Sequence, residues 1–322
     1  MATRNEHSFY QHTLAHPIHV IGRGLHSGKS VSMTLLPASA DTGYVFERQD
    51  VHVEKGEVTA RWNNVTDTRL STTVSNSFGV RVSTIEHLLS ALRGMDIDNC
   101  RILIDGPEVP ILDGSAQPFV ELIAQHGVQI LAAERRAILI KKSVWLHDQH
   151  CSAGFQPFPV PWIDMHISFD NPAIGVESLS MPINRQVFQS TIAAARTFGL
   201  AEEIETLQKH GLALGGSLKN AILVGNDGVI NKEGLRYENE FVRHKFLDAV
   251  GDLALAGAPI IGRFVGNRSG HRMNNDLLRQ LMLEQGAWTM TTFRQMAQQK
   301  AIHSESAQNH SSHSSSPQTH AE

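Results

Sequence analysis

The clearest helical pattern in the chain covers residues 239–252. On a helix with about 100° per residue, apolar side chains gather on one side, while His244, Asp248 and Asp252 fall within about 80° of one another on the other side. A His/Asp pair spaced i, i+4 is able to give two ligands to one metal ion. The alternative is a solvated polar face with a local His–Asp hydrogen bond. The helix alone leaves both interpretations open.

A second amphipathic helix is predicted over residues 83–94, where apolar side chains recur at i, i+3, i+4 and i+7 and Gly94 ends the pattern. His87 lies about 150° from that apolar stripe and faces away from it. Glu86 has two interpretations. Ser83-x-x-Glu86 is a capping box, in which the glutamate accepts a backbone N–H at the helix start, or Glu86 is a functional carboxylate next to His87.

Alternating apolar and polar positions predict short β-strands around these helices. Residues 18–36 predict two strands joined by a glycine-rich loop. The loop ends in Gly-Lys-Ser, but it lacks the first glycine of a phosphate-binding loop and leads into a strand, which excludes that motif. His26 in this loop is either a site residue or a hydrogen-bonded turn residue. Further strands are predicted at residues 44–47, 51–53, 58–62, 99–104, 162–169 and 260–265.

Two similar halves are indicated by the order of the elements. Shifting the first half by 158 residues places Leu89 on Leu247, and a strand follows each of the two helices. A polar stretch at 132–136 predicts a boundary between domains at 12–131 and 135–298, with the polar helix faces meeting at a cleft. Shorter helices are predicted at 119–126, 190–196 and 275–284. The Ser/His-rich end predicts a disordered tail over 299–322.

Composition excludes several classes of protein. The 322 residues are 41% hydrophobic and 19% charged, which is typical of a globular protein. A net charge of -4 without a long Lys/Arg run argues against nucleic acid as a partner. No apolar run reaches the roughly 18–20 residues that span a bilayer, and the first residues lack the apolar core of a secretory signal. Cys100 and Cys151 are expected to be free thiols in the cytoplasm.

Several motifs follow one another along the chain: Gly24-Leu25-His26-Ser27-Gly28-Lys29, Ser83-Thr84-x-Glu86-His87, Pro110-Ile111-Leu112-Asp113-Gly114-Ser115-Ala116, Arg196-Thr197-Phe198-Gly199, Phe241-Val242-Arg243-His244-Lys245-x-x-Asp248-Ala249-x-Gly251-Asp252 and Ser269-Gly270-His271. Together they resemble the zinc-dependent UDP-3-O-acyl-N-acetylglucosamine deacetylases of lipid A biosynthesis. The resemblance covers about residues 12–298. It implies an α+β fold of two similar domains, each a small β-sheet layered with helices, and an active site in the cleft between them.

The resemblance also implies a metal centre. It assigns one Zn²⁺ per chain to His87, His244 and Asp248, with the fourth position open for water, which is a catalytic rather than a structural ligand set. Fe²⁺ is an alternative occupant of the same ligands. The implied reaction is hydrolysis of the N-acetyl amide of UDP-3-O-((R)-3-hydroxyacyl)-N-acetylglucosamine with release of acetate, the committed step of the pathway.

Catalytic roles follow from the resemblance residue by residue. Glu86 takes the proton of the water, and His271 protonates the leaving amine. Asp252 orients His271 or stabilises its charge. Thr197 and Lys245 stabilise the oxyanion, a role worth about 3 kcal/mol for each donor.

Substrate contacts are implied in the same way. Arg268 is a candidate phosphate contact, and Phe198 is a candidate wall beneath the sugar or nucleotide. An apolar acyl passage is assigned to Ile204, Ala213, Gly216, Ser217 and Leu223. For its apolar members, ordinary core packing is the alternative. At the rim of the site, Arg69 and Ser71 depart from the family pattern.

The expected protein is therefore a cytoplasmic monomeric enzyme that acts on a UDP-acyl-glucosamine, binds no nucleic acid and is not an integral membrane protein. Two alternatives differ in class. A fusion with a hydroxyacyl dehydratase would need another domain, and a non-catalytic nucleotide-sugar or lipid-binding protein would not need Glu86 together with a complete ligand set.

Overall fold

Two five-stranded sheets form the framework of the computed structural model, which describes residues 6–299 and 301. The first sheet has the order β2-β3-β9-β4-β5 and the second the order β12-β13-β20-β14-β15. The strands of the first are β2 (Ile18–Arg23), β3 (Ser30–Leu36), β4 (Tyr44–Arg48), β5 (Glu57–Thr59) and β9 (Cys100–Ile104). Those of the second are β12 (Val144–Asp148), β13 (Cys151–Gln156), β14 (Trp162–Ser168), β15 (Val176–Pro182) and β20 (Arg263–Asn267).

The two sheets share one topology. In each sheet the central strand comes last in the chain, pairs antiparallel with one neighbour and parallel with the other, and is preceded by a helix. Strand β9 therefore corresponds to β20. The helix that precedes β9 likewise corresponds to the helix that precedes β20. The internal duplication predicted from the sequence is confirmed at the level of strand order, and the α+β class is confirmed as well.

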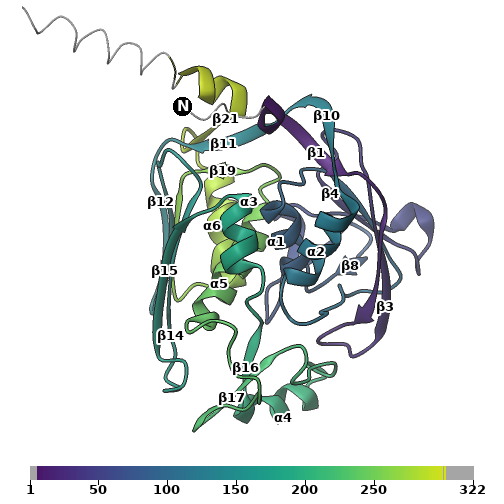
Figure 1. Cartoon of the computed structure of the whole chain (residues 1–322), viewed down its shortest axis with the longest axis vertical. Coiled ribbons are helices and arrows are strands. Elements are labelled where there is room, and N and C mark those ends of the chain that lie inside the picture. Colours follow the sequence, from purple (N-terminus) through teal and green to yellow (C-terminus); the bar gives the residue numbers. More distant parts are fainter. Residues whose placement is uncertain (1–5, 300, 302–322) are drawn as a thin grey trace, which may run out of the picture.

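Helices from both halves lie between the two sheets, as Figure 1 shows. They include α1 (Glu86–Gly94), α2 (Gln117–His126), α5 (Glu240–Ala254) and α6 (His271–Leu283). Helices α1 and α5, one from each half, pack directly against each other. The apolar stripe of α1 is fully buried, but His87 on its other side is only 4% exposed. The polar faces of α1 and α5 are therefore buried against each other, and the interpretation of a solvated face is wrong.

Smaller sheets complete the fold. Strand β1, near the start of the chain, pairs with β10, and β11 lies between β19 and β21. Each half also carries a small three-stranded sheet, β6-β7-β8 in the first half and β16-β17-β18 in the second. Their bounds are β1 (Tyr10–Leu14), β6 (Val65–Asp67), β7 (Thr73–Ser75), β8 (Arg81–Val82), β10 (Val128–Glu134), β11 (Arg136–Ile140), β16 (Phe198–Leu200), β17 (Ile222–Gly225), β18 (Gly228–Val229), β19 (Ile260–Ile261) and β21 (Trp288–Thr292).

The remaining helices are short. They are the 3₁₀ turns at Glu6–Phe9, Val53–Lys55 and Trp62–Asn64, the α3 turn at Arg185–Val187 followed by a π-helical turn at Phe188–Ile192, α4 (Ala201–Lys209), and a helical segment after β21 over residues 293–299 and 301. None of the helices in the described part of the chain is both long and apolar enough to cross a bilayer.

Several predicted elements differ from the structure. The strand predicted at 51–53 gives way to a 3₁₀ turn, in which Val53 is 85% exposed. The helix predicted at 190–196 begins earlier, because the side chain of Asn184 accepts the N–H of Val187 and starts the turn there. The strand predicted at 260–265 is divided between β19 and β20, which belong to different sheets. The tail predicted over 299–322 lies outside the described residues except for 299 and 301, which are helical.

Candidate metal centre

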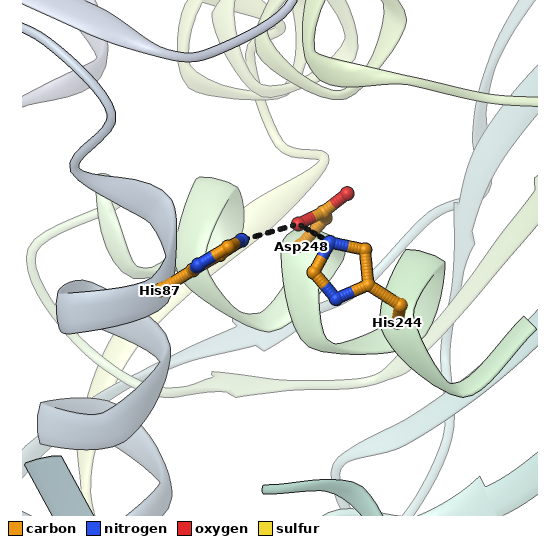
Figure 2. A group of neighbouring side chains, drawn as sticks. All are labelled: His87, His244 and Asp248. Carbon is orange, nitrogen blue, oxygen red and sulfur yellow. Dashed lines mark ion pairs between the residues drawn. The ribbon is translucent and has the colours of Figure 1, made fainter. Parts of the chain in front are cut away.

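Three buried side chains from the two halves converge where α1 and α5 touch, as Figure 2 shows. His87 comes from α1, and His244 and Asp248 come from successive turns of α5. Nε2 of His244 lies 3.3 Å from Oδ1 of Asp248, and Nε2 of His87 lies 3.6 Å from the same oxygen. One ligand atom from each of the three residues can be chosen so that all lie within 4.8 Å of one another. This is the predicted metal set.

Two of the three ligand separations fit a tetrahedral ion. Ligands at about 2.0–2.1 Å from zinc stand about 3.3 Å apart, close to the two separations from Oδ1 of Asp248. That oxygen is buried and accepts no hydrogen bond within the described chain. A buried carboxylate oxygen without a donor is costly, and a cation between the three side chains would satisfy it.

The protonation states of His244 and Asp248 also suit a metal, which needs a neutral imidazole and an ionised carboxylate. Burial lowers the pKa of His244 to about 4. Burial alone would raise the pKa of Asp248, but His244 and Lys245 beside it more than offset this and hold it well below its usual range. Nδ1 of His244 donates to the carbonyl of Ala195 at 3.1 Å, which leaves Nε2 free to bind the ion.

Glu86 is held by the chain before the helix and not by a helix cap. Its Oε2 accepts the backbone N–H of Thr72 at 2.9 Å. Ile85 occupies the N-cap position without a capping hydrogen bond from a side chain, and Ser83 Oγ donates to the carbonyl of Pro107 instead. The capping-box interpretation is therefore wrong. Burial raises the pKa of Glu86, which favours a group that can accept a proton.

A second buried pair lies next to Asp248. Nδ1 of His271 is 2.9 Å from Oδ2 of Asp252, and its Nε2 is 4.0 Å from Oδ2 of Asp248. Burial lowers the pKa of His271, but the Asp252 carboxylate and its hydrogen bond outweigh this and raise it to about 9. Asp252 also accepts hydrogen bonds from Oγ1 of Thr72 at 2.6 Å and from Nδ2 of Asn274 at 2.9 Å. His271 is the first residue of α6, which begins four residues before the predicted helix at 275–284.

Lys245 and Arg268 line a cavity of about 740 Å³ near the metal ligands. Nζ of Lys245 donates to Oδ2 of Asp248 at 2.7 Å. Burial lowers the pKa of Lys245, but Asp248 raises it further than burial lowers it, so that the side chain is charged. Arg268 directly follows the last residue of β20. Its φ of 53° is a strained left-handed conformation.

Thr197 and Phe198 stand at the start of β16, beside α5. The ring of Phe198 packs edge-on against Phe241 with centroids 5.0 Å apart, and against the imidazole of His244 at 6.2 Å. The backbone of Thr197 is fixed on both sides, because its N–H donates to Gly114 and its carbonyl accepts from Ile222, each at 2.8 Å.

The five residues predicted for an acyl passage surround one cavity of about 270 Å³. They share it with Thr197, Phe198 and His26, and the other members of the wall are mainly apolar. His26 lies in a turn and also lines this cavity, so both interpretations of this residue hold. The members are Leu25, His26, Leu70, Thr197, Phe198, Gly199, Ile204, Leu207, Gln208, Ala213, Gly216, Ser217, Leu218, Ala221, Ile222 and Leu223.

The model of one protein family, LpxC, described as UDP-3-O-acyl N-acetylglycosamine deacetylase, matches residues 11–283. Proteins named UDP-3-O-acyl-N-acetylglucosamine deacetylase are similar over most of their length. The one from Vibrio parahaemolyticus is 46% identical over 88% of this chain and 94% of its own, and the one from Haemophilus influenzae is 46% identical over 89% and 95%. One from Geobacter sp. strain M21 is 45% identical over 89% and 94%. The chain belongs to this deacetylase family.

Membership in the deacetylase family makes this chain an amide hydrolase of a metalloenzyme family. Its candidate metal site is the cluster of His87, His244 and Asp248. The family resemblance drawn from the sequence motifs is confirmed.

Sequence patterns missed two polar residues of this site, Thr72 and Asn274. Both contact Asp252, but Thr72 is separated from it by 180 residues. Asn274 stands on the first turn of α6, three positions after His271, and its spacing from His271 on a helix is the one signal that could have identified it.

Proposed function

We propose that this protein removes the N-acetyl group from UDP-3-O-((R)-3-hydroxyacyl)-N-acetylglucosamine and releases acetate, with one Zn²⁺ held by His87, His244 and Asp248. The observation that carries the metal assignment is the buried Oδ1 of Asp248, which has no hydrogen-bond donor and faces two imidazole nitrogens. Zinc in such a site polarises a carbonyl and activates water. The same ligands would accept Fe²⁺.

The residues around the ligands supply the proton transfers. Glu86 accepts a proton from the water that attacks the amide carbon. When the C–N bond breaks, His271 gives a proton to the leaving amine, and the acyl carbon leaves as acetate. Two pKa shifts support these directions of proton transfer. Burial raises the pKa of Glu86, and Asp252 raises the pKa of His271 above its ordinary value in spite of burial.

Two donors are assigned to the oxyanion. Lys245 keeps its charge beside Asp248 and lines the larger cavity, where its ammonium would approach the developing negative charge. Thr197, held rigidly by its backbone, lines the neighbouring acyl cavity. A preorganised donor of this kind is worth about 3 kcal/mol in the transition state.

The substrate would occupy both cavities. The acyl chain would enter the 270 Å³ cavity between Ile204, Ala213, Gly216, Ser217 and Leu223, beside Phe198. The diphosphate would bind in the 740 Å³ cavity, where Lys245 and Arg268 supply cations. We further propose a monomer that works in the cytoplasm without nucleic acid. Free Cys100 and Cys151 agree with a reducing compartment.

Metal analysis combined with an acetate-release assay on the purified protein tests this proposal. We expect at least one zinc ion per folded chain and acetate released in step with free amine. A protein that binds the UDP-sugar but releases no acetate, with or without added Zn²⁺ or Fe²⁺, would be a binding protein and not the proposed enzyme.

The His271→Gln variant tests the acid separately. It should keep its metal, because His271 is not a ligand, and should lose turnover. Full turnover in this variant would remove His271 from the mechanism and leave the metal assignment intact.

A further inference from the structure

A separate apolar cavity lies at the C-terminal ends of α1 and α5, the helices that carry the metal ligands. Its volume is about 310 Å³, at the lower end of the range of about 300–1,000 Å³ for small-molecule sites. Both halves of the chain contribute to it, and none of its lining residues belongs to the acyl cavity. Its buried walls include Phe155, Ile163, Val250, Ala254 and Phe264.

One polar side chain in this cavity has unused hydrogen-bond donors. Arg93, at the end of α1, is only 12% exposed, yet its Nε and Nη1 have no hydrogen-bond partner within the described chain. Nη1 forms an ion pair with Oδ1 of Asp98 at 3.6 Å, which is beyond hydrogen-bond reach, and the guanidinium lies 5.7 Å from the ring centroid of Tyr44. Buried donors on a charged group are costly when they lack an acceptor.

The neighbouring acids are already engaged. Oδ1 of Asp98 accepts from Nε of Arg135 at 2.9 Å, and its Oδ2 accepts the N–H of His12 at 3.0 Å. Asp96 pairs with Arg135 at 2.9 Å. Oδ1 of Asp98 thus accepts a hydrogen bond from Arg135 and meets Arg93 only in a longer ion pair, and Nε and Nη1 of Arg93 remain able to donate to an acceptor from outside the chain.

The local charge also favours an anion. Arg61 lines an adjoining cavity of about 170 Å³, which shares Arg135, Ala258 and Pro259 with the cavity of about 310 Å³. Burial lowers the pKa of Arg61, and the nearby charges of Arg136 and Arg93 lower it further. No hydrogen bond or ion pair of Arg61 to another described side chain balances this charge.

We propose that this cavity binds a single-chain amphiphilic carboxylate, of the fatty acid class. The apolar walls would take the tail, and the carboxylate would accept hydrogen bonds from Nε and Nη1 of Arg93. The two features are complementary to a molecule with one apolar end and one anionic end. A neutral apolar molecule would leave Arg93 unsatisfied, and a small anion such as phosphate would leave the apolar walls empty.

Trp162 provides a local reporter, because it lines this cavity, whereas Trp62, Trp145 and Trp288 line neither this cavity nor the acyl cavity. Brominated dodecanoic acid, titrated into the full-length protein below its micelle concentration, should quench tryptophan fluorescence in a saturable way. The quenching should be lost in Trp162→Phe. Quenching that persists unchanged in Trp162→Phe, or no saturable quenching in the wild type, would overturn the proposal.

Arg93 variants test the carboxylate contact. Arg93→Met should weaken binding of the acid about tenfold or more, because a hydrogen-bonded charge pair is lost, while Arg93→Lys should retain most of it. Brominated dodecanol is the matched probe without charge, and its affinity should be the same in the wild type and in Arg93→Met. Equal weakening of acid and alcohol would contradict the role of Arg93.

A variant that spares the arginine protects the test against misfolding of Arg93→Met. Leu253 lines the same cavity and is only partly buried, so Leu253→Phe should narrow the cavity with little strain. We expect it to weaken the acid and the alcohol alike. Unchanged affinity for both ligands in a folded Leu253→Phe protein would place their binding elsewhere.

Discussion

At the scale of single residues, Thr72 connects the two catalytic carboxylates of the proposed mechanism. Its backbone N–H donates to Glu86 at 2.9 Å, and its hydroxyl donates to Asp252 at 2.6 Å. The residue is 1% exposed. Because Asp252 in turn holds His271, a residue that is neither metal ligand nor acid–base group helps to position both proton-transfer groups, Glu86 through its backbone and His271 through its side chain.

Thr72→Val should lower kcat about tenfold, since it removes one hydrogen bond to a buried charge and keeps the shape of the side chain. The Michaelis constant and the metal content should stay close to those of the wild type. Steady-state kinetics and metal analysis check this. Thr72→Ser is the matched control and should restore most of kcat, because it keeps the hydroxyl. Equal losses of kcat in Thr72→Val and Thr72→Ser would indicate that Thr72 acts through packing instead.

Glu86→Gln should reduce turnover by about 10²–10⁴-fold, the usual contribution of a general base. Metal content should be unchanged, because Glu86 is not among the ligand atoms of the cluster. The glutamine oxygen can still accept the N–H of Thr72, so we expect only a small change in melting temperature. A large loss of stability with nearly full activity would assign Glu86 a structural role.

Local spacing was sufficient to place His244 and Asp248 on one face of a helix and His87 away from the apolar stripe of another, and the three side chains do lie together. Helix geometry left their role open, and the prediction that they bind a metal came from the family resemblance. The local pattern was misleading at Glu86, where a capping box looked complete in sequence. The donor that holds Glu86 comes from Thr72, and such a tertiary contact has no signature in helical periodicity.

At the scale of elements, the close approach of α1 and α5 depends on Gly251. A Cβ atom at this position would lie 2.0 Å from the carbonyl oxygen of Glu86 and 2.9 Å from its Cα. Contacts this short with backbone cannot be relieved by a rotamer change. The absence of a side chain at Gly251 therefore allows α5 to bring His244 and Asp248 next to His87.

Gly251→Ala should destabilise the protein, although alanine in a helix is ordinarily favoured over glycine by about 0.8–1 kcal/mol. Overlap with Glu86 backbone should cost about 1–3 kcal/mol and separate the helices, so metal affinity should fall as well. Denaturant unfolding and zinc titration check both effects. Gly225→Ala is the control, because its Cβ would meet only ordinary contacts of 3.4–3.6 Å. Stabilisation by Gly251→Ala would contradict this account of the helix contact.

Long periodic elements were predicted well, and short ones were not. Strand β3 alternates buried and exposed residues as its sequence does, and α5 covers nearly the predicted range. The two-residue strands β18 and β19 carry too few positions for a period to appear, so β18 was missed and β19 was merged with β20. The start of α6 was placed too late, because Gly270 caps it without a side chain and the polar first turn resembles a loop.

At the scale of the whole molecule, the duplicated fold explains why the site lies between the halves. Each half places one helix, α1 or α5, before its central strand, and the equivalent helices pack together. Each of them turns its polar face toward the other, so neither half alone contains the full ligand set. The sequence offered only a faint sign of this symmetry, because strand order is retained while the side chains have diverged.

Because the ligands come from both halves, metal should stabilise the whole molecule. We expect removal of zinc with a chelator to lower the free energy of unfolding by about 3 kcal/mol relative to protein at a free zinc concentration of 100 times Kd. Melting curves with and without chelator, followed by restoration with Zn²⁺, measure the effect. Asp248→Ala is the control and should show no stabilisation by zinc. The chain also carries His303, His310, His313 and His320, which would add to a metal count. Stability is therefore the sharper measurement, and equal stabilisation of wild type and Asp248→Ala by zinc would place the stabilising ion outside the cluster of His87, His244 and Asp248.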